Sequence, residues 1–470
     1  MIERLASDSR CCAPGTAFFA WPGAASDGRG FIPQAIERGC AAVLWQSDNF
    51  AWNNAWRLPN RGIKDLKSKA GFLAHEFYGR PSDALWVCGV TGTNGKTSCS
   101  QWLAHVFSLK EIKTGVIGTL GSGFPGFLSE NSNTTPDALE LHRSLSEMKN
   151  AGAAAATIEV SSHGLDQGRV NGVAFDCALF TNLTHDHLDY HGTMAAYAEA
   201  KARLFDSPRL ETAVLNLDDP FGARMAQRLA ARGVTTIGYS MSGSSVSVSE
   251  FIFVSELQGQ KAKINSSWGS AEASIPQLGT FNVANALGVL GCLVAYGIPF
   301  EEGARLLERL PPVPGRMQTI GERPLVVVDY AHTPDALEKV LAALRPVAQA
   351  RGGRLALVFG AGGERDAAKR PAMGAIASRL ADRVVLTSDN PRGEEPGAII
   401  DAIRRGMSAN CEVEIDRAKA IDAAISSAGE ADVVLVAGKG HENSQEIAGR
   451  CLPFSDSAVV RAALERRGNR

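Results

Sequence analysis

The sequence predicts an α/β protein built from three domains. Its 470 residues exceed what one hydrophobic core usually supports, and a size of roughly 150 residues per domain gives about three domains. Strand-like apolar runs alternate with helical stretches along most of the chain, a rhythm typical of parallel sheets flanked by helices. The proline-rich stretch 311–315 indicates an extended linker, because proline lacks an N–H and disfavours helix in the residue before it. We therefore expect domains over residues 1–84, 85–313 and 314–470.

The first two domains are read from their apolar runs and turn residues. Residues 1–84 mix short apolar runs with Gly and Pro turns, which indicates a small α/β unit. Residues 245–249 alternate between polar and apolar and an apolar run follows at 251–254, which predicts antiparallel strands added at one edge of the central sheet. The glycine-rich stretch 121–126 is expected to be a loop, because Pro125 and the polar run after it replace the helix that a dinucleotide fold requires. The central domain is otherwise expected to be a mostly parallel sheet, with strands over 85–90, 115–119, 156–160, 178–182 and 212–216 and helices over 98–109, 194–205 and 282–296.

The third domain repeats the alternation and predicts a Rossmann-like, doubly wound sheet. In open parallel sheets ligands bind beyond the carboxyl ends of the strands, so residues that directly follow a strand are the candidates for function. Strands are expected over 325–329, 355–360, 383–387 and 432–437, and helices over 334–344, 370–380 and 399–407.

Composition and charge narrow the class of protein. Hydrophobic residues make up 45% of the chain and charged residues 21%, and the net charge of −2 predicts no binding to nucleic acid or to a membrane surface. We find no signal-peptide pattern and no apolar run of about 18 residues, so we expect a cytoplasmic protein, acting as a monomer on small molecules. The nine cysteines contain no CxxC pair, which predicts neither a zinc site nor a disulfide framework.

The stretch 91–97 has the pattern of a phosphate-binding loop. It lies between an apolar strand and an amphipathic helix, where small residues let backbone N–H groups converge on phosphate oxygens. Lys96 supplies a positive charge and the Thr97 hydroxyl is a ligand for Mg²⁺. An ordinary Gly-rich turn is the alternative, because Val90 stands where the usual pattern has Gly. The strand, loop and helix context favours nucleotide triphosphate binding.

Acidic and histidine side chains follow the neighbouring strands. Glu159 closes one strand, and His187 lies in a histidine-rich loop after the next. With Thr97 they form a plausible Mg²⁺ shell, although Mg²⁺ prefers oxygen and an imidazole is a minority ligand. Three histidines within residues 185–191 would by themselves favour a transition metal such as zinc, and the adjacent loop favours Mg²⁺. By spacing alone, Lys201 is a solvated helix residue.

Three turns of the third domain carry both acids and bases. They cover residues 329–334, 389–392 and 438–442, each directly after a predicted strand, so they should converge on one crevice. A separate Gly-rich turn presents Arg365 to an anion. Each turn alone is equally compatible with a simple helix cap, but together they indicate a zwitterionic ligand.

With these motifs assembled, the chain resembles the Mur ligases, ATP-dependent enzymes that build the peptide of the bacterial cell-wall precursor. The resemblance covers nearly the whole chain and rests on stretches 91–97, 159–163, 182–189, 279–285, 315–317 and 329–332. Within the family the chain is most similar to the enzymes that add the third amino acid, through stretches 8–10, 133–135, 187–192 and 438–442.

The resemblance implies a reaction and a set of site residues. ATP would phosphorylate the D-glutamate γ-carboxylate of UDP-N-acetylmuramoyl-L-alanyl-D-glutamate, and an amine would attack the acyl phosphate. Lys96, Glu159, His187 and Lys201 would be catalytic, and Thr97, Glu159, His187 and a carbamylated Lys201 would hold Mg²⁺. ATP would contact Gly92, Thr93, Asn94, Gly95, Lys96, Thr97, Ser98, Asn285, Arg316 and Asp329, and the UDP substrate would contact Ser9, Asn133, Thr134, Thr135, Ser161, Gln167 and Arg169.

The resemblance also implies which amino acid is added. Relatives that add meso-diaminopimelate carry the Asp-Asn-Pro-Arg sequence found at 389–392, and a guanidinium can grip the second carboxylate of that amino acid, which lysine lacks. The expected contacts are Arg365, Asp389, Asn390, Arg392, Gly438 and Glu442.

Other functions remain as alternatives. They are the lysine-adding counterpart, a folylpolyglutamate synthetase, a P-loop switch protein and a non-catalytic nucleotide-binding module. The switch protein is disfavoured because the chain has no Asn-Lys-x-Asp guanine signature, and the non-catalytic module because Lys96 and Glu159 are both present.

Overall fold

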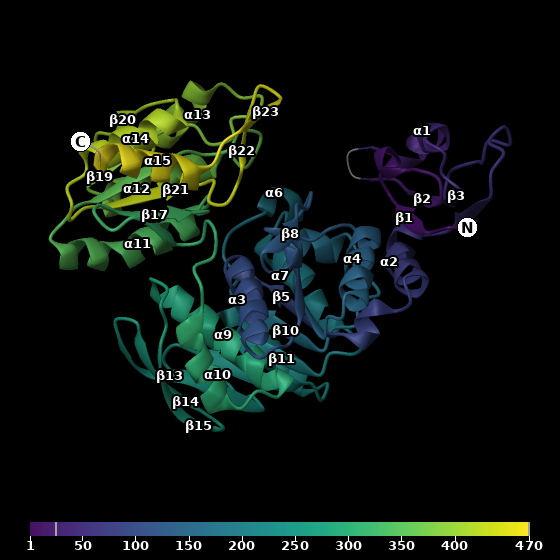
Figure 1. The fold of residues 1–470 in the computed structure, drawn as a ribbon, viewed down its shortest axis with the longest axis horizontal. Helices are drawn as coiled ribbons and strands as arrows, with labels where there is room; N and C mark the ends of the chain where they lie inside the picture. Colours follow the sequence, from purple (N-terminus) through teal and green to yellow (C-terminus); the bar gives the residue numbers. More distant parts are fainter. Residues whose placement is uncertain (24–25, 469–470) are drawn as a thin grey trace.

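A computed structural model describes residues 1–23 and 26–468, and it contains three main sheets that follow one another along the chain (Figure 1). The central part, blue to green in Figure 1, lies between the purple N-terminal part and the yellow-green C-terminal part. The expected α/β fold class with three domains is confirmed, while the boundaries at 84/85 and 313/314 stay predictions. In the described part of the chain, none of the helices is long and apolar enough to cross a bilayer.

The N-terminal sheet is small and wholly parallel. Its order is β1-β2-β3-β4, and its buried residues include Phe18, Val43 and Leu66, none of which has exposed surface. Helix α2 also packs against helix α4 of the central part, which joins the two sheets. The elements are β1 Arg4–Ala6, β2 Thr16–Ala20, β3 Ala42–Gln46, β4 Asn60–Ile63, α1 Ile32–Glu37 and α2 Leu66–Phe77.

The central sheet has eleven strands in the order β15-β14-β13-β12-β11-β10-β5-β9-β6-β7-β8. Strands β6, β9, β5, β10, β11, β12 and β13 run parallel, and antiparallel strands extend both ends. The strands are β5 Trp86–Thr91, β6 Thr114–Gly118, β7 Gly121–Phe124, β8 Phe127–Ser129, β9 Ala155–Glu159, β10 Cys177–Phe180, β11 Thr212–Asn216, β12 Thr235–Ser240, β13 Glu250–Gln258, β14 Lys261–Ser266 and β15 Gly269–Ser274.

Helices cover both faces of this sheet. One core forms where α3, α9 and α10 pack on one face, and a second forms under α4, α5, α7 and α8 on the other. Burial of both faces explains why the central strands are continuous apolar runs rather than alternating ones. The helices are α3 Lys96–Leu109, α4 Ala138–Asn150, α5 Ser162–Asp166, α6 Leu188–His191, α7 Met194–Ala202, α8 Pro220–Ala230, α9 Thr280–Tyr296 and α10 Phe300–Leu306.

Two local predictions for this sheet are wrong. Residues 245–249 form no strand, because serine hydroxyls accept hydrogen bonds from nearby backbone N–H groups: Ser244 accepts from Val246 and Ser249 from Thr236. The predicted antiparallel addition at the sheet edge is confirmed, because β13, which contains residues 251–254, pairs antiparallel with β14, and β14 with β15. The stretch 121–126 is likewise no loop, since β7 and β8 form a hairpin across Pro125 and Gly126.

Three thiols that are distant in sequence meet in the first of these cores. Cys88 and Cys177 are register partners on β5 and β10, and each lies with its Sγ 3.9 Å from the Sγ of Cys292 on α9. That separation is far above the roughly 2.05 Å of a disulfide, so the three groups are packed as small apolar side chains.

The C-terminal sheet has the order β16-β17-β21-β18-β19-β20, parallel except for β16. Its strands alternate cleanly: Leu325 and Val327 face α11, α12 and α13, while Val326 and Val328 face α14 and α15. A separate hairpin follows the last parallel strand. The elements are β16 Gln318–Ile320, β17 Leu325–Asp329, β18 Leu355–Phe359, β19 Arg383–Leu386, β20 Glu412–Val413, β21 Val433–Ala437, β22 Ser444–Ile447, β23 Arg450–Pro453, α11 Pro334–Arg351, α12 Lys369–Leu380, α13 Pro396–Arg404, α14 Arg417–Ser427 and α15 Asp456–Gly468.

Helix α11 is longer than predicted. It begins after Thr333, whose hydroxyl caps the helix with Pro334 in the first turn, and it passes through Pro346 to Arg351 instead of ending at residue 344. A proline removes one hydrogen bond within the helix. The buried face continues beyond it from Leu344 to Ala348, so packing offsets that loss.

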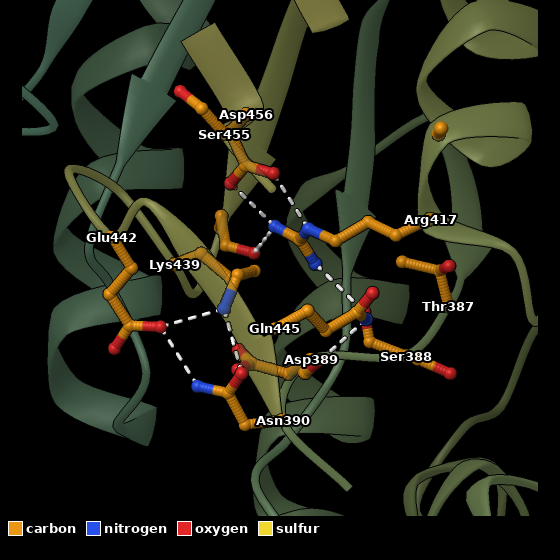
Figure 2. A network of polar contacts seen from close by, with 12 residues as sticks. Thr387, Ser388, Asp389, Asn390, Arg417, Lys439, Glu442, Gln445, Ser455 and Asp456 are labelled. Carbon is orange, nitrogen blue, oxygen red and sulfur yellow. Dashed lines mark hydrogen bonds and ion pairs between the residues drawn. The ribbon is translucent and has the colours of Figure 1, made fainter. Parts of the chain in front are cut away.

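A fully buried ion pair ties this domain together. Arg417, at the start of α14, forms two hydrogen bonds of 2.7 Å to Asp456, at the start of α15, and neither side chain has exposed surface (Figure 2). Its remaining N–H groups donate to the carbonyls of Ser388, two residues after β19, and Ala437, the last residue of β21. The pair therefore holds two helices against two strand ends.

Replacing Asp456 by Ala should lower the unfolding temperature of the C-terminal domain by several degrees. Removing one partner leaves a buried guanidinium without its counter-ion, which costs about 3–5 kcal/mol. Calorimetry of the full chain would measure the shift, with Asp422→Ala as control because its pair with Arg466 is exposed. Equal shifts in the two variants would contradict a special role for the buried pair.

Candidate active site

The phosphate-binding loop lies at the centre of the large sheet, between β5 and α3. Val90 is fully buried within β5, so the residue that departs from the usual pattern packs in the core ahead of the loop. Gly92 and Gly95 have φ of +149° and +88°, and a Cβ on Gly95 would lie 2.5 Å from Oδ1 of Asn285. The backbone N–H of Thr93 donates to the carbonyl of Asn182 at 2.7 Å, which ties the loop to the end of β10.

Two lysines lie against this loop. Lys96 donates to the carbonyls of Gly92 and Thr93, at 2.9 Å each. Lys201 is 1% exposed, donates to the Gly92 carbonyl at 2.8 Å, and lies 4.6 Å from the centre of the Tyr197 ring. Burial, together with the charge of Lys96, holds the pKa of Lys201 well below its ordinary value. Lys201 is thus a buried amine and not the solvated helix residue that its spacing suggests.

Oxygen ligands gather beside the loop. Thr97 Oγ1 donates to Glu159 Oε2 at 2.9 Å, and the Thr119 hydroxyl donates to the same oxygen at 3.0 Å. They meet because β9 lies between β5 and β6 in the sheet, so Glu159 ends a strand whose neighbours lead to the other two residues. Hydroxyl and carboxylate oxygens are the donors that Mg²⁺ prefers, so this group fits that ion.

His187 lies near the loop in a left-handed conformation, with φ of +55°. Its Nε2 is 3.4 Å from Asp186, and its ring centre is 4.7 Å from that of His163. Burial lowers the pKa of His187 to about 4, and the charges of Lys96 and Lys201 act in the same direction. The ring is therefore neutral near pH 7, with a lone pair available to a metal ion. Among the described residues, no hydrogen bond joins it to Thr97 or Glu159.

A cavity opens between this loop and the C-terminal domain. Its lining includes Asn94, Ser98, Asn285, Arg316, Asp329 and His332. Arg316 donates to Thr97 Oγ1 at 3.1 Å and stacks over the Tyr330 ring at 4.5 Å. Asp329 accepts from the backbone N–H groups of Met317 and Ala331, so it orders the backbone next to Arg316. Asn94 bonds Asp335 across the same gap, at 3.3 Å.

The charge of Asp186 is also set from both domains. Burial by itself raises the pKa of this carboxyl group, but nearby His187, His332 and Lys369 outweigh burial and lower it. Two of those three residues, His332 and Lys369, belong to the C-terminal domain, so both domains act on this carboxyl group.

The residues assigned to the UDP substrate are largely brought together. Thr135 Oγ1 donates to Ser161 Oγ at 3.0 Å, and Arg169 donates to the Thr135 carbonyl at 2.8 Å and to Gln167. Ser9 lies in the N-terminal domain, where its hydroxyl donates to Gln34 at 2.6 Å. Asn133 is exposed beside Ser132, and Thr134 forms a hydrogen bond with Thr119 at 3.0 Å.

The C-terminal turns converge as their positions after parallel strands require. The Gly438 N–H donates to the Asp329 carbonyl at 3.1 Å, and a Cβ on Gly438 would lie 2.4 Å from Asp389 Oδ2. Arg392 has a φ of +53°, donates to the Gly363 carbonyl at 2.7 Å and pairs with Glu446 at 3.2 Å. The remaining assigned residues are Arg365, which is exposed beside Gly362, and Asn390 and Glu442, which hydrogen-bond each other at 2.8 Å.

Sequence reasoning missed four contributors to these contacts. The apolar pattern predicts Thr119 as the last residue of a strand. Strand β6 ends one residue earlier, and the Thr119 N–H donates to the Glu159 carboxylate. The hydroxyls of Tyr197 and Thr93 share a hydrogen bond of 3.0 Å. Tyr197 lies four residues before Lys201, and this spacing is a sequence signal that the two side chains share one helix face. Asp186 and Lys439 carried no local signal beyond lying in strand-following turns.

Comparison with known proteins gives matches along the whole chain. The family models described as "Mur ligase family, catalytic domain", "Mur ligase middle domain" and "Mur ligase, glutamate ligase domain" match residues 2–78, 90–293 and 315–440. The chain is 49% identical to a UDP-N-acetylmuramoyl-L-alanyl-D-glutamate--2,6-diaminopimelate ligase of Chromobacterium violaceum, covering 100% of this chain and 95% of that one.

Solved structures agree. One of a UDP-N-acetylmuramoyl-L-alanyl-D-glutamate--2,6-diaminopimelate ligase superposes with a TM-score of 0.69 at 35% identity, over 99% of this chain and 95% of the other. A MurF ligase from Thermotoga maritima in complex with ADP shares the fold, with a TM-score of 0.67 at 18% identity over 99% and 97% of the two chains.

Replacing Arg316 by Ala should weaken ADP binding by about ten- to a hundredfold, the usual scale of losing a charged hydrogen-bonding group. Arg316 is a cation of the C-terminal domain that hydrogen-bonds Thr97 of the phosphate-binding loop, so its loss should remove positive charge where the loop would hold a phosphate. Titration calorimetry with ADP would measure the change, and Arg305→Ala, an exposed residue on α10, is the matched control. Unchanged affinity would place the nucleotide elsewhere.

Proposed function

The chain belongs to the Mur ligase family, and we propose that it joins meso-2,6-diaminopimelate to the D-glutamate γ-carboxylate of UDP-N-acetylmuramoyl-L-alanyl-D-glutamate, with ATP as co-substrate. Identity of 49% over the whole chain to a ligase with that name carries the proposal. The site supports it, because one cavity lies between the phosphate-binding loop and the turn after β17, and Arg316 of the C-terminal domain hydrogen-bonds Thr97 of the loop.

The first step transfers a phosphoryl group. An oxygen of the γ-carboxylate attacks the terminal phosphorus of ATP, the bond to the bridging oxygen breaks, and ADP leaves with that electron pair. The backbone N–H groups of residues 92–97 and the charges of Lys96 and Arg316 would hold the phosphates in place. Asn285 lies against Gly95 and would contact the nucleotide from α9.

The second step forms the amide bond. The amine of the incoming amino acid attacks the carbonyl carbon of the acyl phosphate, the carbon–oxygen bond breaks, and inorganic phosphate leaves. The new amide nitrogen passes its extra proton to the departing phosphate or to solvent water. The UDP substrate would reach this point along Thr134, Thr135, Ser161, Gln167 and Arg169, with Ser9 contributing from the N-terminal domain and Asn133 from the exposed turn.

A Mg²⁺ ion fits the oxygen donors described above. Thr97 and Glu159 would hold it, with Thr119 in support and His187 as a single imidazole ligand. When bound, it would neutralise phosphate charge. A neutral Lys201 amine is the form that reacts with carbon dioxide, and the carbamate would add another anionic oxygen donor at the loop.

Selectivity for diaminopimelate would rest on charge. Arg392, with Arg365 beside it, would bind the distal carboxylate, and Glu442 with the Gly438 carbonyl would bind the distal ammonium. Asp389 lies directly beneath Gly438 and would orient that turn. Lysine has no distal carboxylate to contact Arg392, which disfavours the lysine-adding alternative.

The test of the activity is phosphate release from ATP with UDP-N-acetylmuramoyl-L-alanyl-D-glutamate, comparing meso-diaminopimelate with L-lysine. Release that depends on diaminopimelate is expected. No release with either amino acid would refute the proposal, and a preference for lysine would favour the alternative enzyme. Glutamate addition to a folate would instead favour a folylpolyglutamate synthetase.

Arg392→Ala should raise the KM for diaminopimelate by about a hundredfold and leave the KM for ATP nearly unchanged, since it removes a bidentate contact to one carboxylate. Steady-state kinetics would measure both constants. Arg404→Ala, an exposed residue on α13, is the matched control. An equal rise in both constants would mean that Arg392 acts structurally.

Lys201→Ala should abolish activity while leaving the overall fold intact, because the carbamate would be lost. Carbon NMR with isotope-labelled carbon dioxide should show a carbamate signal in the wild-type protein and none in the variant. A wild-type enzyme that is fully active without this signal would contradict the carbamate, and Lys419→Met provides a control at an exposed lysine.

A further inference from the structure

Lys439 is a buried cation between the turns 389–392 and 438–442, which together form the proposed amino-acid crevice. It follows β21, and its side chain has no exposed surface. The ammonium donates to Glu442 Oε2 at 2.7 Å and to Asn390 Oδ1 at 2.8 Å, and Figure 2 shows it between these two residues. Both partners are proposed contacts of the substrate, whereas Lys439 itself is covered. A buried ammonium is costly unless it is paired and hydrogen-bonded, so these bonds define where it sits.

The ammonium determines which way the Asn390 amide points. Two donors face Oδ1, the Lys439 ammonium at 2.8 Å and the Glu446 N–H at 3.0 Å. An amide turned the other way would place its own N–H groups against two donors, so the chemistry excludes that orientation. Asn390 is therefore held with its NH₂ group toward Glu442, at 2.8 Å.

The same contacts give the two oxygens of the Glu442 carboxylate different environments. Oε2 accepts from both Lys439 and Asn390. In Figure 2 the other oxygen is turned away from them, and in the described part of the chain it forms no hydrogen bond. The side chain is 29% exposed, so that oxygen is available to a donor entering the crevice.

The turn that carries Lys439 is held in place by hydrogen bonds from Arg417. Arg417 bonds the carbonyls of Ser388 and Ala437, which lie two residues before Asn390 and Lys439 respectively. Its pair with Asp456 fixes the guanidinium, as Figure 2 shows. The two turns that meet at Lys439 thus share one rigid support, and Gln445 adds a bond to the Asp389 carbonyl at 2.7 Å.

We propose that Lys439 is a positioning residue for amino-acid selection. It holds Asn390 as a hydrogen-bond donor and Glu442 as an acceptor, so that the carboxylate and the ammonium of the amino acid can bind in only one orientation. The proposal rests on the proposed function. It assigns Lys439 no contact with the substrate, and it predicts that the residue acts only through these two partners.

The test compares Lys439→Met with the wild type in the phosphate-release assay. Methionine has similar volume but no donor, so the KM for meso-diaminopimelate should rise by about ten- to a hundredfold, the scale of losing charge-assisted hydrogen bonds. The KM values for ATP and the UDP substrate should change by less than about twofold, because neither ligand is assigned a contact with Asn390 or Glu442. Lys419→Met, on the exposed side of α14, should behave as wild type.

A double-mutant cycle separates positioning from general damage. Because Lys439 acts through Glu442 as well as Asn390, Lys439→Met should raise the KM for diaminopimelate less in the Glu442→Gln background than in the wild type. Additive losses, equal changes in all three KM values, or no change would overturn the proposal. If thermal unfolding shows that Lys439→Met does not fold, Lys439→Gln, which keeps a donor, is measured instead and should show a smaller but equally selective rise.

These outcomes differ from failure of the proposed function. Wild-type protein and Lys419→Met that release no phosphate with diaminopimelate would refute the activity itself, whereas active controls with an unselective Lys439 variant would refute only the role of Lys439.

Discussion

Parallel strands deliver the loops that follow them to one edge of their sheet, and every part of this site depends on that constraint. The central sheet brings Thr97, Thr119 and Glu159 together because β9 lies between β5 and β6. The C-terminal sheet brings the turns after β17, β19 and β21 together in the same way. The cavity beside the phosphate-binding loop is lined from the C-terminal domain by the turn after β17, including Asp329 and His332, so groups that no single sheet could assemble meet there.

Basic side chains surround the phosphate-binding loop. Lys96, Lys201 and Arg316 all bond to groups of the loop, and Glu159 is the nearby carboxylate that is hydrogen-bonded to Thr97. Burial, and to a lesser extent nearby like charges, lower the pKa of Lys96 and Lys201, and an anionic ligand would favour their charged forms. This arrangement connects the fold to nucleotide chemistry, since phosphate oxygens supply the negative charge that the loop favours.

The C-terminal domain uses buried charges differently. Arg417 is matched by Asp456, and Lys439 is shared by Asn390 and Glu442, so each cation has its partner within the protein. Such groups contribute little net stability but hold their surroundings in one arrangement. In this domain they hold the turns that would select the amino acid. The Arg417–Asp456 pair bonds the backbone of the two turns that carry Asn390 and Lys439.

The sequence by itself determined the α/β class, most strands, the phosphate-binding loop and the family, because these depend on contiguous patterns: apolar runs, a glycine-rich turn and short motifs. Its local errors at 121–126 and 245–249 arose where turn chemistry and serine hydroxyls decide between strand and loop. Only the tertiary structure decided that Lys201 and Lys439 are buried and that Thr119 meets Glu159. Those facts depend on the order of strands in a sheet and on the helices packed against it, and residue spacing along the chain determines neither.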